Sequence, residues 1–166
     1  MRSSKKLISR ILWAFAVFGV LSCCAAAQRV EIFGGYQFTH LQPSYNANGW
    51  NASVTGNFKH ILGITGDFSG AYRNGVDTYT YAGGPVFQAR LPVVQPFVHA
   101  LFGGISASAP GISTNGFAML LGGGLDIGMR KGFGWRIVQA DWIGTKVSGD
   151  TRNRNVRAST GIVIKF

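Results

Sequence analysis

The sequence predicts an all-β fold, an eight-stranded antiparallel up-and-down transmembrane β-barrel. Three observations lead to this prediction: runs of about ten residues alternate apolar and polar side chains, eight such runs follow one another, and breaks rich in Gly, Pro and Asn separate them. Because the side chains of a strand alternate between its two faces, each run offers an apolar face that fits lipid and a polar face that does not. Backbone groups in lipid must pair within the protein, so the sheet must close on itself.

A removable leader precedes the predicted barrel. Residues 1–10 are basic, residues 11–21 (ILWAFAVFGVL) are apolar, and three alanines end at Ala27. This order is typical of a secretory signal peptide. We therefore expect a signal peptide over residues 1–27, cleaved near Ala27, and a barrel domain over residues 28–166. The apolar run falls short of the roughly 20 residues of a membrane-spanning helix, which argues against an anchor.

Cysteine and charge usage narrow the chemistry. Cys23 and Cys24 both precede the expected cleavage, so the mature chain would hold no disulfide and no thiol. Acylation of Cys23, as in a lipoprotein, is the alternative. Four of the 16 basic residues also lie in the leader, which leaves 12 against 6 acidic residues, a net charge of +6. This modest excess suits phosphates or anionic lipid better than DNA, so we expect no nucleic-acid partner.

Connections of alternating length separate the predicted strands. Longer loops are expected at 42–49, 73–77, 107–115 and 147–154, with shorter turns between them. Short periplasmic turns and longer extracellular loops, with both termini in the periplasm, are typical of membrane barrels. The predicted strands cover residues 30–41, 50–59, 62–72, 78–91, 96–106, 116–130, 135–146 and 155–166.

Two of the predicted strands contain an irregularity. Pro85 lies inside the fourth run and cannot donate a ladder hydrogen bond, so we expect a bulge or a local defect there. In the seventh run Arg136 falls on the opposite face from Gln139 and Asp141. Either the Arg136 side chain reaches the lipid headgroups or a β-bulge shifts the register.

Aromatic residues gather near the ends of the predicted strands. In a membrane barrel such residues form girdles at the two interfaces, where one edge of the ring is wet. Core packing in a soluble barrel is the alternative, but that barrel would place its apolar residues inward, where this sequence is polar. The aromatic residues concerned are Trp50, Phe58, Tyr72, Tyr79, Trp135, Trp142 and Phe166.

The last residues carry a family resemblance. In Asn155–Phe166 (NVRASTGIVIKF), Ile162, Ile164 and Phe166 share one face, and the chain stops on the aromatic residue. This run resembles the closing strand of bacterial outer-membrane β-barrels, whose terminal aromatic is the assembly signal. The resemblance implies a small OmpA-like or OmpX-like eight-stranded barrel in the outer membrane of a Gram-negative cell envelope. It also implies that the barrel-assembly machinery recognises Phe166. We expect the protein to be a monomer.

Charged residues recur on the inward face of the runs. An eight-stranded barrel has room only for its own side chains, so no open pore is expected. A charge inside such a barrel is costly unless it is paired, which predicts a lumenal network of ion pairs and hydrogen bonds. A proton or ion pathway is the alternative and needs a continuous wet channel. The predicted members of the network are Glu31, Lys59, Asp67, Arg90, Asp126, Arg130, Asp141 and Arg157.

The histidines do not indicate an enzyme. The outer-membrane lipid A deacylase carries a His-x-Ser pair, whereas His40, His60 and His99 are followed two residues later by Gln, Leu and Leu. No two of the three share a predicted strand at metal-ligand spacing. We therefore expect no catalytic, metal or cofactor site, and we place His99 in the lumen as a hydrogen-bonded residue.

The remaining candidate for a functional site is the extracellular rim. Lys146, Arg152 and Arg154 gather positive charge beside the last loop. Guanidinium groups suit phosphates, and outer-leaflet lipopolysaccharide presents phosphates at that height; a solvated loop without a ligand is the alternative. We expect a structural and surface-interaction role, with a plugged lumen, outer-membrane lipid around the wall and loops presented outside. The rival functions are a porin-like small-solute channel and a periplasmic lipid-binding barrel.

Overall fold

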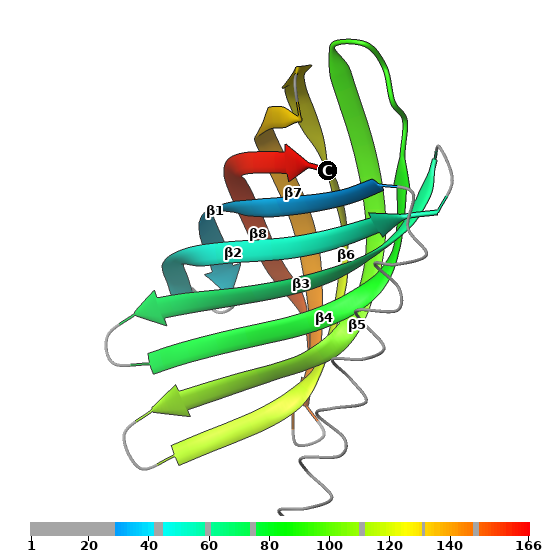
Figure 1. Cartoon of the computed structure of the whole chain (residues 1–166). Helices are drawn as coiled ribbons and strands as arrows, with labels where there is room; N and C mark the ends of the chain where they lie inside the picture. Colours follow the sequence, from blue (N-terminus) through cyan, green and yellow to red (C-terminus); the bar gives the residue numbers. More distant parts are fainter. Residues whose placement is uncertain are drawn as a thin grey trace, which may run out of the picture.

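The computed structural model describes residues 29–41, 45–58, 61–73, 76–109, 112–130, 132–147 and 150–166. The described residues form eight strands: β1 (Arg29–Leu41), β2 (Tyr45–Asn57), β3 (Leu62–Arg73), β4 (Val76–Gln88), β5 (Val94–Ala109), β6 (Ile112–Arg130), β7 (Phe133–Val147) and β8 (Asp150–Lys165). The strands pair in sequence order as a closed antiparallel barrel (Figure 1). The predicted all-β, eight-stranded barrel is confirmed. The predicted leader and its cleavage site near Ala27 lie outside the described residues.

No helix among the described residues is long and apolar enough to cross a membrane. The barrel closes where β8 pairs with β1, in a ladder that begins at Glu31 opposite Lys165. The end of β8 (red) lies beside β1 (blue) in Figure 1. The backbone N–H groups of Val30 and Phe166 each donate to the other residue's carbonyl oxygen, at 3.2 and 2.9 Å. Closure therefore removes the sheet edge that would leave backbone groups unpaired.

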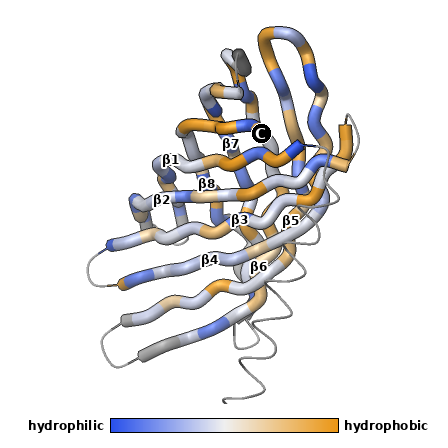
Figure 2. The backbone as a smooth tube through the Cα atoms, viewed as in Figure 1, coloured by the Kyte–Doolittle hydropathy of each residue, from blue (hydrophilic) through white to orange (hydrophobic). Residues whose placement is uncertain are grey.

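The two faces of the sheet differ in the way the alternation predicts. Val54 and Ile162, on the outward face, are 40% and 42% exposed, whereas the inward Asp126 is 0% exposed. Hydrophobic and hydrophilic residues are interspersed along the strands in Figure 2, because successive side chains point to opposite faces. Exposed large hydrophobic residues come from all eight strands, among them Ile32, Val54, Ile64, Tyr81, Val98, Phe117, Trp135 and Ile162. An apolar outer belt around a polar interior is the distribution of a membrane barrel.

The strands extend further than the sequence predicted at the hairpin end, which is the end of the barrel opposite Arg29 and Phe166. β2 begins at Tyr45 and β6 at Ile112, inside segments that were predicted to be loops. Backbone N–H and C=O groups pair in a hairpin whatever the side chains are, so the ladders continue where the apolar alternation has stopped. The predicted alternation of long and short connections is therefore wrong. The predicted loops concerned are 42–49, 73–77, 107–115 and 147–154.

The interruption predicted at Pro85 is a local defect. Pro85 pairs with Ile64 on β3, but the ladder from β4 to β5 is interrupted at Gly84 and Pro85. The ladder resumes at Val86 with no register shift recorded in this pair of strands. The missing N–H of proline thus interrupts the pairing but leaves the register of the two strands unchanged.

The irregularity at Arg136 is a β-bulge. The register between β7 and β8 shifts between Arg136 and Gln139, and Ile137 and Val138 are both exposed. Because two successive residues point outward, the alternation of inward and outward side chains shifts by one position along β7. Arg136 and Gln139 therefore both point inward. Of the two alternatives for Arg136, the bulge is the one found, and its side chain is buried in the barrel.

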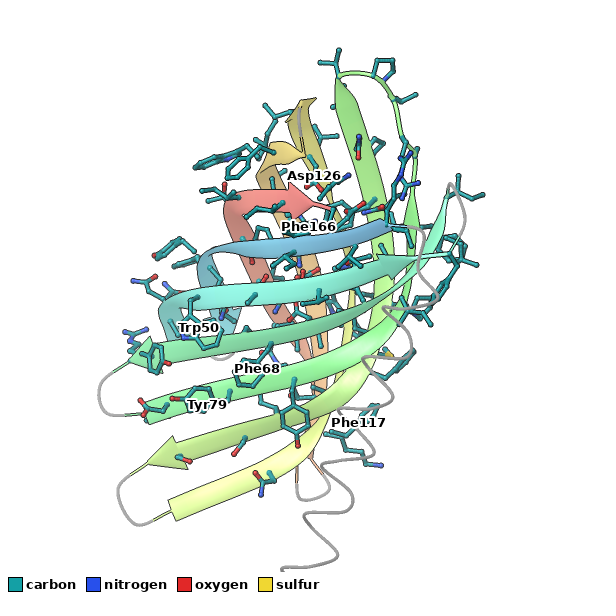
Figure 3. All side chains as sticks on the ribbon, in the orientation of Figure 1. Trp50, Phe68, Tyr79, Phe117, Asp126 and Phe166 are labelled. Atoms are coloured by element: carbon teal, nitrogen blue, oxygen red, sulfur yellow. The ribbon has the colours of Figure 1, made fainter. Side chains whose placement is uncertain are left out.

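An aromatic cluster covers the outer face of β2, β3 and β4 near the hairpin end. Trp50 Nε1 donates a hydrogen bond of 3.0 Å to the Tyr72 hydroxyl. The ring centroid of Phe68 lies 5.4 Å from that of Trp50 and 6.3 Å from that of Tyr79. Figure 3 shows Trp50, Phe68 and Tyr79 on this wall. Rings that pack on an apolar surface and keep polar groups near one end of the barrel suit a membrane interface.

Candidate functional site: a buried ionic network

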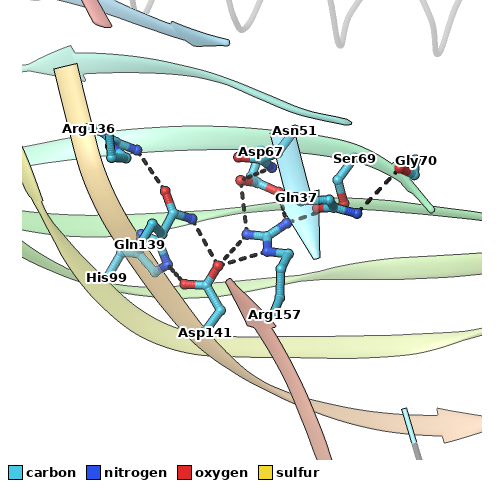
Figure 4. Close-up of polar contacts among 10 residues, drawn as sticks. All are labelled: Gln37, Asn51, Asp67, Ser69, Gly70, His99, Arg136, Gln139, Asp141 and Arg157. Atoms are coloured by element: carbon cyan, nitrogen blue, oxygen red, sulfur yellow. Dashed lines mark hydrogen bonds and ion pairs between the residues drawn. The ribbon is translucent and has the colours of Figure 1, made fainter. Parts of the chain in front are cut away.

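Arg157, on β8, is the centre of a polar network inside the barrel (Figure 4). Its guanidinium is 1% exposed and lies between Asp67 on β3 and Asp141 on β7. Nη1 and Nη2 donate to the two carboxylate oxygens of Asp67 at 2.8 and 3.1 Å, and Nε donates to Asp141 at 2.7 Å. Since β3 and β7 lie across the barrel from each other, this one side chain ties opposite walls together.

A chain of hydrogen bonds continues from Asp141 towards β6. Asp141 accepts bonds from His99 Nε2 at 2.7 Å and from Gln139 Nε2 at 2.9 Å. The side-chain amide oxygen of Gln139 (Oε1) accepts a bond of 2.7 Å from Arg136 Nη1. Arg136 in turn donates two bonds, of 2.8 and 3.1 Å, to the carboxylate of Asp126. The carboxylates are therefore held in position by several donors from different strands.

Aromatic rings surround the second guanidinium. The Cζ atom of Arg136 lies 4.4 Å from the ring centroid of Phe33 on β1 and 4.1 Å from that of Phe97 on β5. Both rings are buried inside the barrel. Cation–π contact of this kind stabilises a desolvated guanidinium, and it depends on the β7 bulge that points Arg136 inward.

A second polar cluster lies nearer the termini, around Glu31 on β1. The carboxylate of Glu31 accepts hydrogen bonds from Asn57 at 3.0 Å and from Gln88 at 2.9 Å. Lys165 Nζ lies 3.1 Å and Arg90 Nη2 3.8 Å from the same carboxylate. Arg90 lies in the connection between β4 and β5, where burial lowers the pKa of its guanidinium and Glu31 opposes that shift. This cluster joins four strands at the terminus end of the barrel.

An apolar layer adjoins the ionic network on its hairpin side. Leu101, Leu120 and Ile143 are buried together, and Ala118 packs with them. A cavity of ≈ 10 Å³ lies below this layer, among the inward side chains of β2, β3, β4, β5 and β7. That volume is about what one water molecule requires.

The charged groups of the central network neutralise one another. Among the described residues the central network joins three carboxylates and two guanidiniums, and amide and imidazole groups supply further donors. A buried ion pair contributes little net stability, yet removal of one partner leaves an uncompensated charge. In the described ranges no group of three or more His, Cys, Asp and Glu side chains has the geometry to hold a metal ion. The chemistry present therefore cross-links the strands of the barrel.

The structure brings most of the residues predicted for the lumen into these two clusters. Lys59 lies outside the described residues, as does the side chain of Arg130. Arg136 and Gln139 also belong to the network but were not among its predicted members, although the alternation places Gln139 on the inward face. The predicted residues that the structure places in the clusters are Glu31, Asp67, Arg90, Asp126, Asp141 and Arg157.

The residues predicted for the rim are only partly described. Lys146 lies near the hairpin end of β7 and is exposed. The side chains of Arg152 and Arg154 lie outside the described residues, although the backbone places both in β8. Arg157 forms ion pairs with the buried carboxylates of the network and does not contribute to the rim. Phe166 follows β8 directly, and its side chain is 73% exposed.

Comparison with known proteins bears on the fold. No family model and no curated protein matches the sequence. Among solved structures, the barrel resembles Neisserial surface protein A (NspA), with a TM-score of 0.62 and 14% identity over 83% of this chain and 96% of that chain. It also resembles the N-terminal β-barrel domain of Pseudomonas aeruginosa OprF, with a TM-score of 0.62 and 14% identity over 84% and 98% of the two chains.

A third similar structure is Ail, the attachment invasion locus protein of Yersinia pestis, in complex with the heparin analogue sucrose octasulfate. Its TM-score is 0.54 and its identity 19%, over 83% of this chain and 98% of that chain. All three likenesses extend over almost the whole of the compared chains, and none depends on close sequence identity. The chain therefore has the fold of the small eight-stranded outer-membrane β-barrels, as its closing strand predicted.

Proposed function

We propose that the protein spans the outer membrane of a Gram-negative cell, after removal of residues 1–27, and has a structural and surface-interaction role. One observation carries this proposal: charged groups such as Arg157 are buried at the centre while Val54 and Ile162 face outward. A soluble barrel would reverse this distribution, because water favours charges outside and apolar groups inside. The likeness in fold to NspA, Ail and OprF supports the same location.

The proposal includes a plugged lumen. It is supported by the side chains that cross the interior, above all Arg157, and by the size of the central cavity, which is ≈ 10 Å³. A porin-like channel for small solutes needs a continuous wet path through this network. A periplasmic lipid carrier needs an apolar lumen, whereas Asp126 and Asp141 occupy this one. The contacts therefore favour a closed barrel over both rival functions.

The rim is the proposed contact surface. Lys146 is exposed at the hairpin end, and Arg152 and Arg154 lie in the facing strand β8. These basic residues suit the phosphates of lipopolysaccharide or another polyanion. The complex of the similar protein Ail with a heparin analogue supports this choice of ligand chemistry.

The closing strand is the proposed signal for assembly. β8 ends beside β1, and the exposed ring of Phe166 follows it. A C-terminal strand that presents its aromatic residue in this way suits recognition by the barrel-assembly machinery. We propose a monomer, because closure leaves no sheet edge for a second chain.

Cell fractionation followed by planar-bilayer recording tests the proposed function. The full chain, expressed with its leader in a Gram-negative host, is expected in the outer-membrane fraction and should migrate differently on a gel before and after heating. The purified protein is expected to give no steady conductance in a planar bilayer, because the ionic network blocks the interior. Regular conductance steps would favour the solute channel. Recovery in the soluble periplasmic fraction would favour the lipid carrier.

A further inference from the structure

An open groove lies on the outer wall, away from the buried network. It has a volume of ≈ 440 Å³ and extends over strands β1 to β5. Ala52, Gly66 and Gly83 form its floor, and Gly66 faces Gly83 directly across the pair of β3 and β4. Phe68 and Phe102 form two of its sides. The groove therefore lies where three strands in succession present a small residue to the outside.

Two other glycines on this wall, Gly70 and Gly104, are covered by the barrel's own aromatic side chains. A Cβ atom at Gly70 would lie 2.9 Å from both Trp50 Nε1 and the Tyr72 hydroxyl oxygen. One at Gly104 would collide with the ring and hydroxyl oxygen of Tyr81. In contrast, nothing lies within 4 Å of the Cβ position at Gly66. The floor of the groove is thus left open by the described residues, while the neighbouring glycines are shielded in the manner called aromatic rescue.

We propose that one acyl chain of a bilayer lipid lies in this groove, an inference that rests on the proposed membrane location. The walls select this occupant. Phe68 and Phe102 are 45% and 49% exposed, so they stand out from the sheet on two sides of the glycine floor. A thin, flexible chain enters between them. The convex wall of a second barrel would meet these ridges first and bury little of the roughly 1,000 Å² that a specific interface needs.

The depth of the groove fits a lipid of the leaflet at the hairpin end. Phe68 belongs both to the groove and to the aromatic cluster with Trp50 and Tyr79. The Trp50 indole N–H and the Tyr72 and Tyr79 hydroxyls mark the level at which rings meet water and headgroups. An acyl chain that descends from this level passes directly over Gly66 and Gly83.

Filling the groove tests the proposal. The full chain is expressed with its leader, extracted from host membranes in a mild detergent and titrated with palmitoyl-oleoyl phosphatidylglycerol. Native mass spectrometry then counts the lipids on each barrel. Gly66→Leu adds a side chain into open space, so the barrel itself is not strained. We expect the wild type to bind one lipid tightly, and Gly66→Leu to bind it about tenfold more weakly, the factor given by the loss of about two buried methylene groups.

Three further variants control the experiment. Ala140→Leu adds three carbon atoms, against four in Gly66→Leu, to the exposed face of β7, across the barrel from β3, and is expected to bind lipid like the wild type. Gly83→Leu fills the same floor, and Phe102→Ala removes a wall; both are expected to weaken binding. These two keep the test decisive if Gly66→Leu fails to show the heat-modifiable migration of a folded barrel.

Each contrary outcome has a distinct meaning. Equal lipid binding by the wild type and the groove variants would overturn the proposal while leaving the membrane location intact. A two-barrel species that Gly66→Leu abolishes would overturn it in favour of a second copy of the chain. Recovery of the wild type from the soluble fraction, before any lipid is added, would overturn the proposed function and this inference together.

Discussion

Arg157 shows why a single buried charge matters in this barrel. Its guanidinium bonds to Asp67 and Asp141 from opposite walls, and all three side chains are buried. The desolvation cost of these groups has already been met by their mutual attraction and hydrogen bonds, so the set contributes little net free energy as long as it is complete. Loss of one member is different, because the remaining charges cannot reach water.

Arg157→Met tests this at the residue scale. The substitution keeps much of the side-chain volume but leaves two carboxylates without their shared counter-charge. We expect the free energy of unfolding to fall by about 3–5 kcal/mol. Urea unfolding in detergent or vesicles, followed by tryptophan fluorescence, measures the change.

Two comparisons make the Arg157 result interpretable. Lys146→Met removes an exposed charge on β7 and is expected to change the free energy of unfolding by less than about 0.5 kcal/mol. Adding Asp67→Asn and Asp141→Asn to Arg157→Met removes the stranded charges and is expected to restore part of the loss. Wild-type stability for Arg157→Met alone would contradict the account of the network.

The limits of sequence reasoning are clear at the same scale. Period-two alternation identified Asp67, Asp141 and Arg157 as inward, because a charge on the polar face of a strand is easy to recognise. It could not show that Arg157 meets Asp67, since the two lie on β8 and β3 and their distance depends on the tilt and register of the closed sheet. Gln139 was overlooked as a member because a neutral amide on that face carries no comparable signal.

The β-bulge of β7 is the element on which the second half of the network depends. Ile137 and Val138 both face outward, and this extra residue keeps Arg136 and Asp141 on the inward face of one strand. Without it, the period-two alternation would carry one of the two charges to the lipid-facing side. Loss of the bulge would therefore cost far more free energy than the few ladder hydrogen bonds that the bulge interrupts.

Joint deletion of Ile137 and Val138 tests the bulge at the element scale, because it removes the bulge and still leaves Arg136 and Asp141 an odd number of positions apart. Either Arg136 or Asp141 must then face lipid, and an arginine at the bilayer midplane costs about 2–4 kcal/mol. We expect a loss of unfolding free energy at least that large, or failure to show heat-modifiable migration. Ile137→Val, which keeps the bulge, is the control and should cost about 0.5–1.5 kcal/mol at most. A deletion variant as stable as the control would show that the bulge does not set the phase.

Strand ends were harder to predict than strand centres for a physical reason. The runs around Val54 and Ile162 alternate strongly because one face of each strand is exposed and apolar while the other is buried and polar. Near the hairpins the side chains are polar on both faces, yet β2 still begins at Tyr45 and β6 at Ile112, because backbone pairing alone continues the ladder. The sequence could therefore locate the lipid-facing part of each strand but not the extension beyond it. At Arg136 the sequence was compatible with a side chain that reaches the headgroups and with a β-bulge, and the structure shows the bulge.

At the scale of the whole molecule, the barrel is inverted relative to a soluble protein. Its ionic groups are joined by ion pairs and hydrogen bonds in the middle, and its apolar side chains form the outer belt. The sheet closes where the end of β8 pairs with the start of β1. The closed sheet pairs the backbone groups that lipid could not satisfy, and the buried ion pairs connect opposite walls. These properties support a barrel whose functional contacts lie on its surfaces, at the rim and on the lipid-facing wall.

The most direct test of this inversion is a spin-label scan of β3 in lipid vesicles. Single cysteines replace Ile64 and Phe68, which face outward, and Thr65 and Ser69, which face inward. Labels at the two outward positions should collide with oxygen, which partitions into lipid, far more often than with a water-soluble nickel chelate. Labels at the two inward positions should be shielded from both reagents. Collision of the outward labels with the nickel chelate would contradict the membrane-spanning barrel.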